Sequence, residues 1–269
     1  MTTGWFTEIR GRVPRVAAIL LGLIPIIASL ALWAFLTHGP REERRISVAI
    51  LPSPGEVWDS IPQLFERRHL VDNTLASLRR IGLSFAIALA VALPLGILMG
   101  AFGSASSTFS PVVTASGYIP IASLVPLTMS WWGIGEEQKV YFLALAFIIS
   151  LLPLVIKAVD GVPDVFLKTA YTLGAGRLQS VFKILIPIAL PDLWHGMRLS
   201  FGVGWTYLVL AEVVVLDKGL GYLVGISQRQ GPREHIYLVI ILIAILAFIF
   251  DLVWVTLGNL LFPYRRRAA

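Results

Sequence analysis

Long apolar runs alternate with shorter polar segments along most of the chain. Six runs are strongly apolar, and they cover residues 16–37, 81–101, 109–132, 140–157, 195–216 and 236–262. A helix rises 1.5 Å per residue, so about 20 apolar residues cross a hydrocarbon core of roughly 30 Å. The pattern therefore predicts an all-α integral membrane protein with six transmembrane helices.

The third apolar run, residues 109–132, contains Pro111, Gly117, Pro120 and Pro126. An interior proline frees a backbone carbonyl, which a neighbouring helix or water in a cavity must then satisfy. We therefore predict a broken span that lines a pathway. A kinked helix that only packs against its neighbours is the alternative.

Residues 162–191 lie between two apolar runs and are neither apolar throughout nor loop-like. We predict a first helix here, because Pro163 and Asp164 suit its first turn and apolar residues recur at helical spacing. Gly174 ends it, since glycine readily adopts the left-handed conformation of a helix C-terminus. A second amphipathic helix follows, and we expect Pro187 and Pro191 to close it. The apolar positions are Val162, Val165, Phe166 and Ala170, then Leu178, Val181, Phe182 and Leu185.

The composition supports the same class of protein. The mean hydropathy is +0.79, and hydrophobic residues make up 57% of the chain against 14% charged residues. These values exceed what a water-soluble core requires. The chain has no cysteine, which excludes disulfides, thiolate metal sites and thiol nucleophiles. The net charge of +6 is spread over loops and ends, which argues against nucleic acid and fits a protein bordered by anionic lipid.

Two polar connections have structure of their own. LPSPGEVWDSIPQLF, within residues 38–80, predicts an amphipathic helix on the membrane surface, with a stripe through Val57, Trp58, Ile61 and Leu64. DKGLGYLVGISQRQGPREHIYL follows the fifth run and contains glycines that permit tight turns. We expect an external turn and a short re-entrant helix there.

No constellation typical of an enzyme, a cofactor site or a metal site is present. His38, His69, His195 and His235 lie at predicted membrane borders without ligand spacing. The chain lacks GxxxxGK[ST], so it cannot bind ATP in a P-loop. Any transport driven by ATP must therefore take its energy from a separate chain.

Two acidic residues lie inside predicted spans, where ionisable groups by default suggest function. We interpret Glu212 as a gate or interhelical lock, with a structural hydrogen bond to a neighbouring helix as the alternative; for Asp251 we favour the structural role. Arg80 and Arg198 are placed at span ends, so an anion would meet neutral donors and broken-helix ends rather than a fixed buried cation. Candidate pathway residues, each of which can instead be a packing residue, are Tyr118, Ser123, Thr128, Ser130, Trp131, Trp132, Trp205 and Tyr207.

The stretch KTAYTLGA…IPIALP resembles the "EAA" cytoplasmic loop of permeases from bacterial ABC importers. Gly174, Ile186, Pro187, Leu190 and Pro191 stand where that motif has them. Two positions depart from it: Lys168 replaces the usual glutamate and Thr169 the first alanine, so a salt bridge made by that glutamate has no counterpart here.

Further stretches are similar to the nitrate, sulfonate, taurine and bicarbonate branch of these permeases. They are LPSP, TLASLRRIGLSFAIALAVALPLGILMG, GIGEEQKVYFLALAF and GLGYL, and the similarity extends over residues 51–263. It implies the type I (MetI-like) fold, with a segment 1–15, a six-helix permease domain 16–262 and a basic tail 263–269. ATP and Mg²⁺ would then lie on a partner ATPase, with no cofactor on this chain.

The resemblance also implies partners and a location. Two copies would pair in the bacterial inner membrane, an ATPase dimer would dock on residues 162–191, and a periplasmic or lipoprotein substrate-binding protein would deliver the solute. The implied ATPase contacts are Lys168, Ala170, Gly174, Ala175, Gly176, Arg177, Leu178, Gln179, Pro187 and Pro191. Both termini are assigned to the cytoplasm by this resemblance alone, because each side of the membrane would carry eleven lysines and arginines.

Two alternatives stay open. An ion-coupled secondary carrier or a channel would use Glu212 or Asp251 as a proton site. Within the permease family, the solute can be an oxyanion of the nitrate, sulfonate or bicarbonate type, or a neutral or cationic compound such as a thiamine precursor.

Overall fold

A computed structural model describes residues 13–40, 44, 46–214 and 217–264, and these form helices without any strand. Five helical segments are long and apolar enough to cross a membrane. They comprise α2 (Arg15–Leu36), α5 (Leu70–Ala101), α8 (Glu136–Asp160), α11 (Ile186–Val214, continuous with the preceding helix from Arg177) and α13 (Arg233–Leu261). A bent helix pair makes a sixth span if its two halves are counted together, so the predicted all-α membrane fold is confirmed with five to six candidate spans.

The bent pair is the predicted broken third span. Helix α6 (Gly103–Ser116) is followed by a 3-10 turn (Ile121–Ser123) and α7 (Leu124–Trp132), and the two halves meet at 83°. The break falls between Gly117 and Pro120, whose backbone is extended. Pro126 lies in the first turn of α7, where no backbone N–H is needed, so it does not interrupt the helix.

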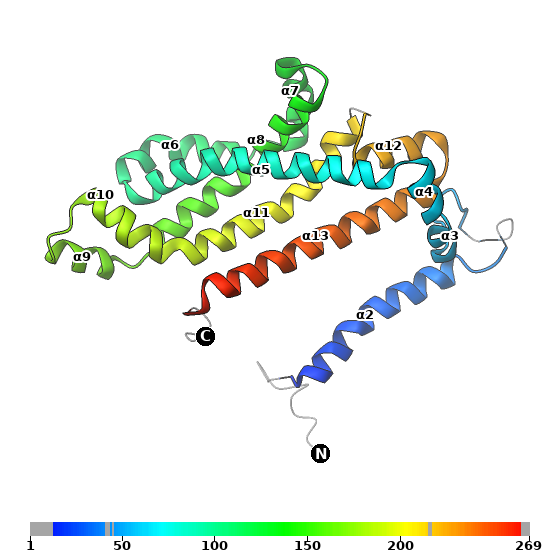
Figure 1. The fold of residues 1–269 in the computed structure, drawn as a ribbon, viewed down its shortest axis with the longest axis horizontal. Helices are drawn as coiled ribbons and strands as arrows, with labels where there is room; N and C mark the ends of the chain where they lie inside the picture. Colours follow the sequence, from blue (N-terminus) through cyan, green and yellow to red (C-terminus); the bar gives the residue numbers. More distant parts are fainter. Residues whose placement is uncertain (1–12, 41–43, 45, 215–216, 265–269) are drawn as a thin grey trace.

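Helices α5, α8 and α11 form the packed centre (Figure 1). Glycines let the backbones approach, as small residues do between helices in lipid. A Cβ atom added at Gly96 would lie 2.5 Å from Val155 Cγ1, and one at Gly204 would lie 2.1 Å from the Phe147 ring. The Phe85 ring meets the Phe147 ring edge-on, with centroids 5.1 Å apart, where the three helices face one another.

Helix α2 stands apart from this centre (Figure 1), and none of its most apolar 18 residues is buried. Among the described residues, its contacts with the rest of the protein lie at its C-terminal end. The Trp33 indole N–H donates to the Pro52 carbonyl at 2.8 Å, and the Trp33 ring stacks on Tyr237 of α13. The Tyr237 hydroxyl in turn donates to the Ile50 carbonyl at 2.7 Å.

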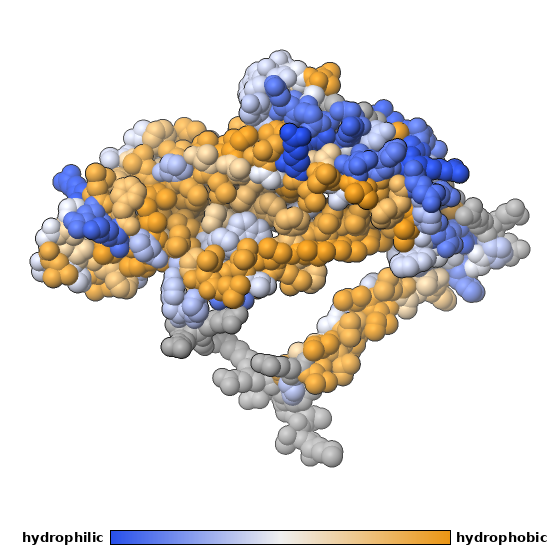
Figure 2. Space-filling view, in the orientation of Figure 1, coloured by the Kyte–Doolittle hydropathy of each residue, from blue (hydrophilic) through white to orange (hydrophobic). Residues whose placement is uncertain are grey.

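The short helices gather at the two ends of the bundle (Figure 1). Helices α9 (Asp164–Thr172) and α10 (Arg177–Ser180) lie at one end, where α2 begins and α13 finishes. The opposite end holds α3 (Pro54–Asp59), α4 (Ile61–Arg67) and α12 (Leu220–Gln230). Figure 2 shows hydrophilic residues at both ends of the bundle with a hydrophobic zone between them. We call the end with α9 and α10 the coupling end and the other the outer end.

The segment predicted as one amphipathic helix is two. It divides at Ser60, because Pro62 can occupy the first turn of a new helix but not the interior of an old one. Ser53 begins α3 with a capping box to Glu56. Val57 and Leu64 are buried as the predicted stripe requires, whereas Trp58 is 74% exposed. The short helix predicted after the fifth span is present as α12.

Close packing of α5 on α8 makes a testable prediction. A Cβ at Gly100 would lie 2.7 Å from Val159 Cβ and 3.0 Å from the Ile156 carbonyl oxygen, and a backbone atom cannot move aside cheaply. We expect Gly100→Val to lower the free energy of unfolding by about 1–3 kcal/mol through overpacking. Unfolding of the purified chain in detergent measures this. Gly82→Val is the control on the same helix, since nothing lies within 4 Å of that position; equal stability of the two variants would contradict the packing described.

Candidate functional site

The first helix of the coupling end finishes at Gly174, as the sequence predicts. Gly174 has φ +82°, in the left-handed region. The Ala175 N–H donates to the Ala170 carbonyl, and the Gly174 N–H donates to the Tyr171 carbonyl, both at 3.0 Å. This is the Schellman arrangement, which satisfies carbonyls that a helix end leaves free. A residue with a side chain would be strained at this position.

The second helix does not close at Pro187 and Pro191, so that expectation is wrong. Helix α10 passes through a π-helical turn (Val181–Leu185) into α11 without a break. In this turn the Ile186 N–H donates to the Val181 carbonyl, five residues back. The wider turn relieves the clash that the Pro187 ring would otherwise make with the carbonyl of Lys183. Both prolines therefore lie inside one helix, from Arg177 to Val214.

The α9–α10 pair exposes several large apolar side chains among charged and polar ones. Leu173 is 83% exposed, and Leu178 and Phe182 are each 66% exposed. Val181 and Leu185 point the other way and are buried, which anchors the pair to the centre. Of the ten residues predicted to contact an ATPase, seven are exposed, Ala175 is half-buried, and Ala170 and Pro191 are buried. The exposed seven are Lys168, Gly174, Gly176, Arg177, Leu178, Gln179 and Pro187.

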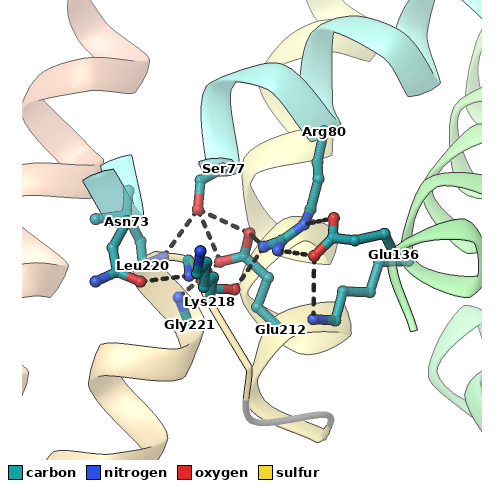
Figure 3. A network of polar contacts seen from close by, with 10 residues as sticks. Asn73, Ser77, Arg80, Glu136, Glu212, Lys218, Leu220 and Gly221 are labelled. Carbon is teal, nitrogen blue, oxygen red and sulfur yellow. Dashed lines mark hydrogen bonds and ion pairs between the residues drawn. The ribbon is translucent and has the colours of Figure 1, made fainter. Parts of the chain in front are cut away.

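The outer end is held by a buried carboxylate, that of Glu212 on α11, which is fully buried. It accepts hydrogen bonds from the Ser77 hydroxyl at 2.7 Å, the Arg80 guanidinium at 2.6 Å and the Gly221 N–H at 2.8 Å. These donors belong to α5 and to the first turn of α12 (Figure 3). One side chain thus joins three helices.

The Arg80 guanidinium extends the network to α8. It donates to both oxygens of Glu136, at 2.6 Å to Oε2 through Nε, and to the Lys218 carbonyl at 2.6 Å. Arg80 is 2% exposed. The ammonium group of Lys139, fully buried, lies 3.7 Å from Glu136 Oε1. Two cations and two carboxylates therefore balance within one cluster, in which Glu136 is half exposed and the charges of Arg80, Lys139 and Glu212 are buried.

The glycines of GLGYL are explained by this carboxylate. A Cβ at Gly219 would lie 2.4 Å from the Glu212 carboxyl carbon, and one at Gly221 would lie 2.7 Å from the Val209 carbonyl oxygen. The missing side chains let α12 begin directly over the carboxylate, where a negative charge is favourable. Its first N–H groups are also satisfied by α5, since Gly219 donates to Asn73 and Leu220 to Ser77.

Arg198 corrects the expectation that no cation lies within a span. It lies near the middle of α11 and forms a two-point ion pair with Asp251 of α13, at 2.6 and 2.7 Å. Each charge is neutralised by its partner on the adjacent helix, so the residues around both can remain apolar. A basic residue in the first turn of one apolar run and an acidic residue inside the next run, on helices that are neighbours in sequence, is the signal that could have predicted the pair.

The predicted pathway residues divide into two groups. Tyr118, Ser123, Ser130, Trp131 and Trp132 lie along the bent third span and are exposed in the single chain. Thr128 is buried and accepts from Gln138 of α8 at 2.9 Å, and Trp205 is buried among Phe201 and Phe250. Tyr207 is half-buried. A pathway role for these residues stays a prediction.

Known proteins resemble the chain along most of its length. Residues 92–266 match the profile of the family described as "Binding-protein-dependent transport system inner membrane component". The taurine transport system permease protein TauC of Escherichia coli (strain K12) is 32% identical over 212 residues, covering 77% of each chain. The nitrate import permease protein NrtB of Leptolyngbya laminosa is 23% identical, covering 85% of this chain and 82% of NrtB. An inward-facing structure of the MetNI methionine ABC transporter superposes with a TM-score of 0.63 at 21% identity, covering 71% of this chain and 94% of that chain.

The buried network at the outer end predicts that removing one charge, that of Glu212, strongly lowers the free energy of unfolding. Glu212→Gln keeps the size of the side chain but leaves Arg80 with one carboxylate partner in place of two. Breaking a buried ion pair from one side costs about 3–5 kcal/mol, and we expect a loss of that order in the free energy of unfolding in detergent. Glu137→Gln removes a carboxylate from the exposed face of α8 and should change stability by less than about 0.5 kcal/mol. A Glu212→Gln variant as stable as this control would refute the network.

Proposed function

The chain belongs to the family of binding-protein-dependent transport system inner membrane components, and from that premise we propose that it is the importer subunit that joins a cytoplasmic ATPase to a solute pathway. It is the permease subunit of an ABC importer, with an all-helical MetI-like fold. The ATPase, the substrate-binding protein and the solute are the proposed parts. ATP and Mg²⁺ bind on the ATPase, and this chain supplies the membrane path.

The observation that carries the proposal is the exposed apolar surface of α9 and α10. Apolar side chains as open as Leu173 and Leu178 are unfavourable in water and favourable in a protein interface. The pair lies at an end of the bundle where hydrophilic residues gather (Figure 2), so we place it outside the hydrocarbon core. We propose that a cleft of an ATPase subunit covers this surface, which places the coupling end and both termini in the cytoplasm.

The same helix carries the docking surface and the outer network. Arg177 and Glu212 belong to one continuous helix and are separated by roughly 50 Å along its axis. A displacement of the docked surface is therefore passed to the outer end through α11. Two copies would be needed to enclose a pathway, and α6, which has no buried residue in the single chain, is free to face a second copy.

We propose that the solute carries an oxyanion group. Support comes from the relatives, one named for taurine, which is a sulfonate, and one for nitrate. A separate binding protein would deliver the solute to the outer end, where the polar segments 46–69 and 217–232 lie. The test is uptake of labelled taurine or nitrate into proteoliposomes that contain the chain with its ATPase and binding protein. Uptake that needs ATP and survives a proton uncoupler supports the proposal; uptake without the ATPase that the uncoupler abolishes contradicts it.

The proposed docking surface predicts that substitutions on it weaken binding of the ATPase. Leu173→Asp and Leu178→Asp each place a charge at the centre of the proposed interface, where the few contacts that dominate binding each cost about 2 kcal/mol or more when they are lost. We expect each variant to retain less than about a tenth of the ATPase that the wild-type chain retains on affinity purification. Ile134→Asp is the matched control, because Ile134 is 76% exposed at the outer end. Undiminished retention by both α9–α10 variants would exclude this surface as the ATPase contact.

A further inference from the structure

A cavity of about 900 Å³ opens at the outer end beside the buried network. Its walls come from the end of α4, the outer third of α5, the first turn of α8 and the segment that leads into α12. Five of the side chains that line it are arginine or lysine and three are carboxylates. These are Arg67, Arg68, Arg79, Arg80 and Lys218, with Asp72, Glu136 and Asp217.

The carboxylates that line this cavity do not neutralise all of its positive charge. Arg80 is occupied by Glu136, Glu212 and the Lys218 carbonyl, and Arg68 donates to Gln230. Arg67 and Arg79 are exposed, and within the described residues neither forms a hydrogen bond or an ion pair. Two guanidinium groups thus face the cavity with their donors available, and guanidinium binds tetrahedral oxyanions through paired N–H groups.

A sharp turn between α4 and α5 places Arg67 and Arg79 on the wall of the same cavity. His69, between α4 and α5, has φ +48°, a left-handed conformation that is uncommon for a residue with a side chain. The Asn73 amide fixes the turn by donating to the carbonyls of Arg68 and His69, at 2.9 and 3.0 Å. The turn sets the end of α4 against α5, and Arg67 and Arg79 both line the cavity between these helices and α8. Strain kept in this way often marks a functional position.

The cavity lies at the level where lipid meets water. Helix α5 has 32 residues and is about 48 Å long, which exceeds a hydrocarbon core of roughly 30 Å by about twelve residues. Leu75 and Leu83, also on the cavity wall, are 65% and 47% exposed, so one side of the cavity is apolar. Figure 2 shows the corresponding hydrophilic patch over α4, the outer part of α5 and α12.

We propose that this cavity is an oxyanion-binding site in which Arg67 and Arg79 hold a phosphate or sulfonate group. Two sources offer that group at this depth: the headgroup of an anionic phospholipid, whose chains would lie along Leu75 and Leu83, and a soluble solute arriving at the outer end. The second source rests on the proposed function, whereas the first does not.

The test uses the purified full-length chain and the double variant Arg67→Gln/Arg79→Gln. Both residues are exposed, so the variant should fold, and its unfolding temperature in detergent checks this. Arg229→Gln is the control, because Arg229 is an exposed arginine at the same end that does not line the cavity. One arm measures binding of inorganic sulfate and of taurine by titration calorimetry at low ionic strength. The other counts phosphatidylglycerol molecules retained from nanodiscs by native mass spectrometry, with phosphatidylcholine nanodiscs for comparison.

Each arm has a defined result. Losing charge-assisted hydrogen bonds from two guanidinium groups should weaken binding at least about tenfold. A loss of sulfate or taurine binding in the double variant, with the control unchanged, supports the site with a soluble occupant. A loss of retained phosphatidylglycerol supports it with a lipid headgroup, even if the chain fails to transport taurine or nitrate. If the double variant and the control behave alike in both arms, the site does not exist.

Discussion

The guanidinium group of Arg80 is the contact on which the outer half of the molecule depends. Helices in lipid gain little from hydrophobic association, so close packing and interhelical polar bonds must hold them together. Arg80 supplies such bonds to α8 through Glu136, to α11 through Glu212 and to the start of α12 through the Lys218 carbonyl. It can do so because the two carboxylates balance its charge together with that of Lys139, and because Gly219 and Gly221 leave room for the carboxylate of Glu212.

The coupling end is built in the opposite way. Its two short helices meet at a glycine, expose most of their apolar side chains and are anchored through few buried residues, Ala170, Val181 and Leu185 among them. Such a segment has little to hold its shape apart from the Schellman bonds and the covalent connection to α8 and α11. In the proposed importer, the ATPase would fix the final geometry of this surface. The outer end is instead fixed by its own buried hydrogen bonds.

Periodicity and composition were sufficient for the architecture, because spans in lipid must be long, apolar and helical whatever they contact. The break in the third span and the glycine stop at Gly174 were also predictable, since proline and glycine act through local backbone geometry. The charged network was not. Glu212 could be singled out as a buried acid, but its partners lie far away in sequence. A single sequence does not reveal which helices pack against one another. The continuity of α10 with α11 was missed because a π-helical turn absorbs Pro187, and that depends on hydrogen bonds rather than on residue type.

A stiff outer end and an adaptable coupling end need a connection that is neither fully rigid nor fully flexible, and α11 has this character. The helix is continuous from the docking surface to Glu212, so no flexible loop separates Leu178 from the outer end. Its one irregular turn, Val181–Leu185, lies next to the docking surface, and π-helical turns are weaker points of a helix at which bending is concentrated. Bending there would let α10 adjust to a partner while the remainder of α11, fixed to α13 by Arg198 and Asp251 and to α5 by Glu212, moves as one body. In the proposed importer, the ATPase would therefore move the whole outer cluster or leave it unmoved, with little room for partial displacement.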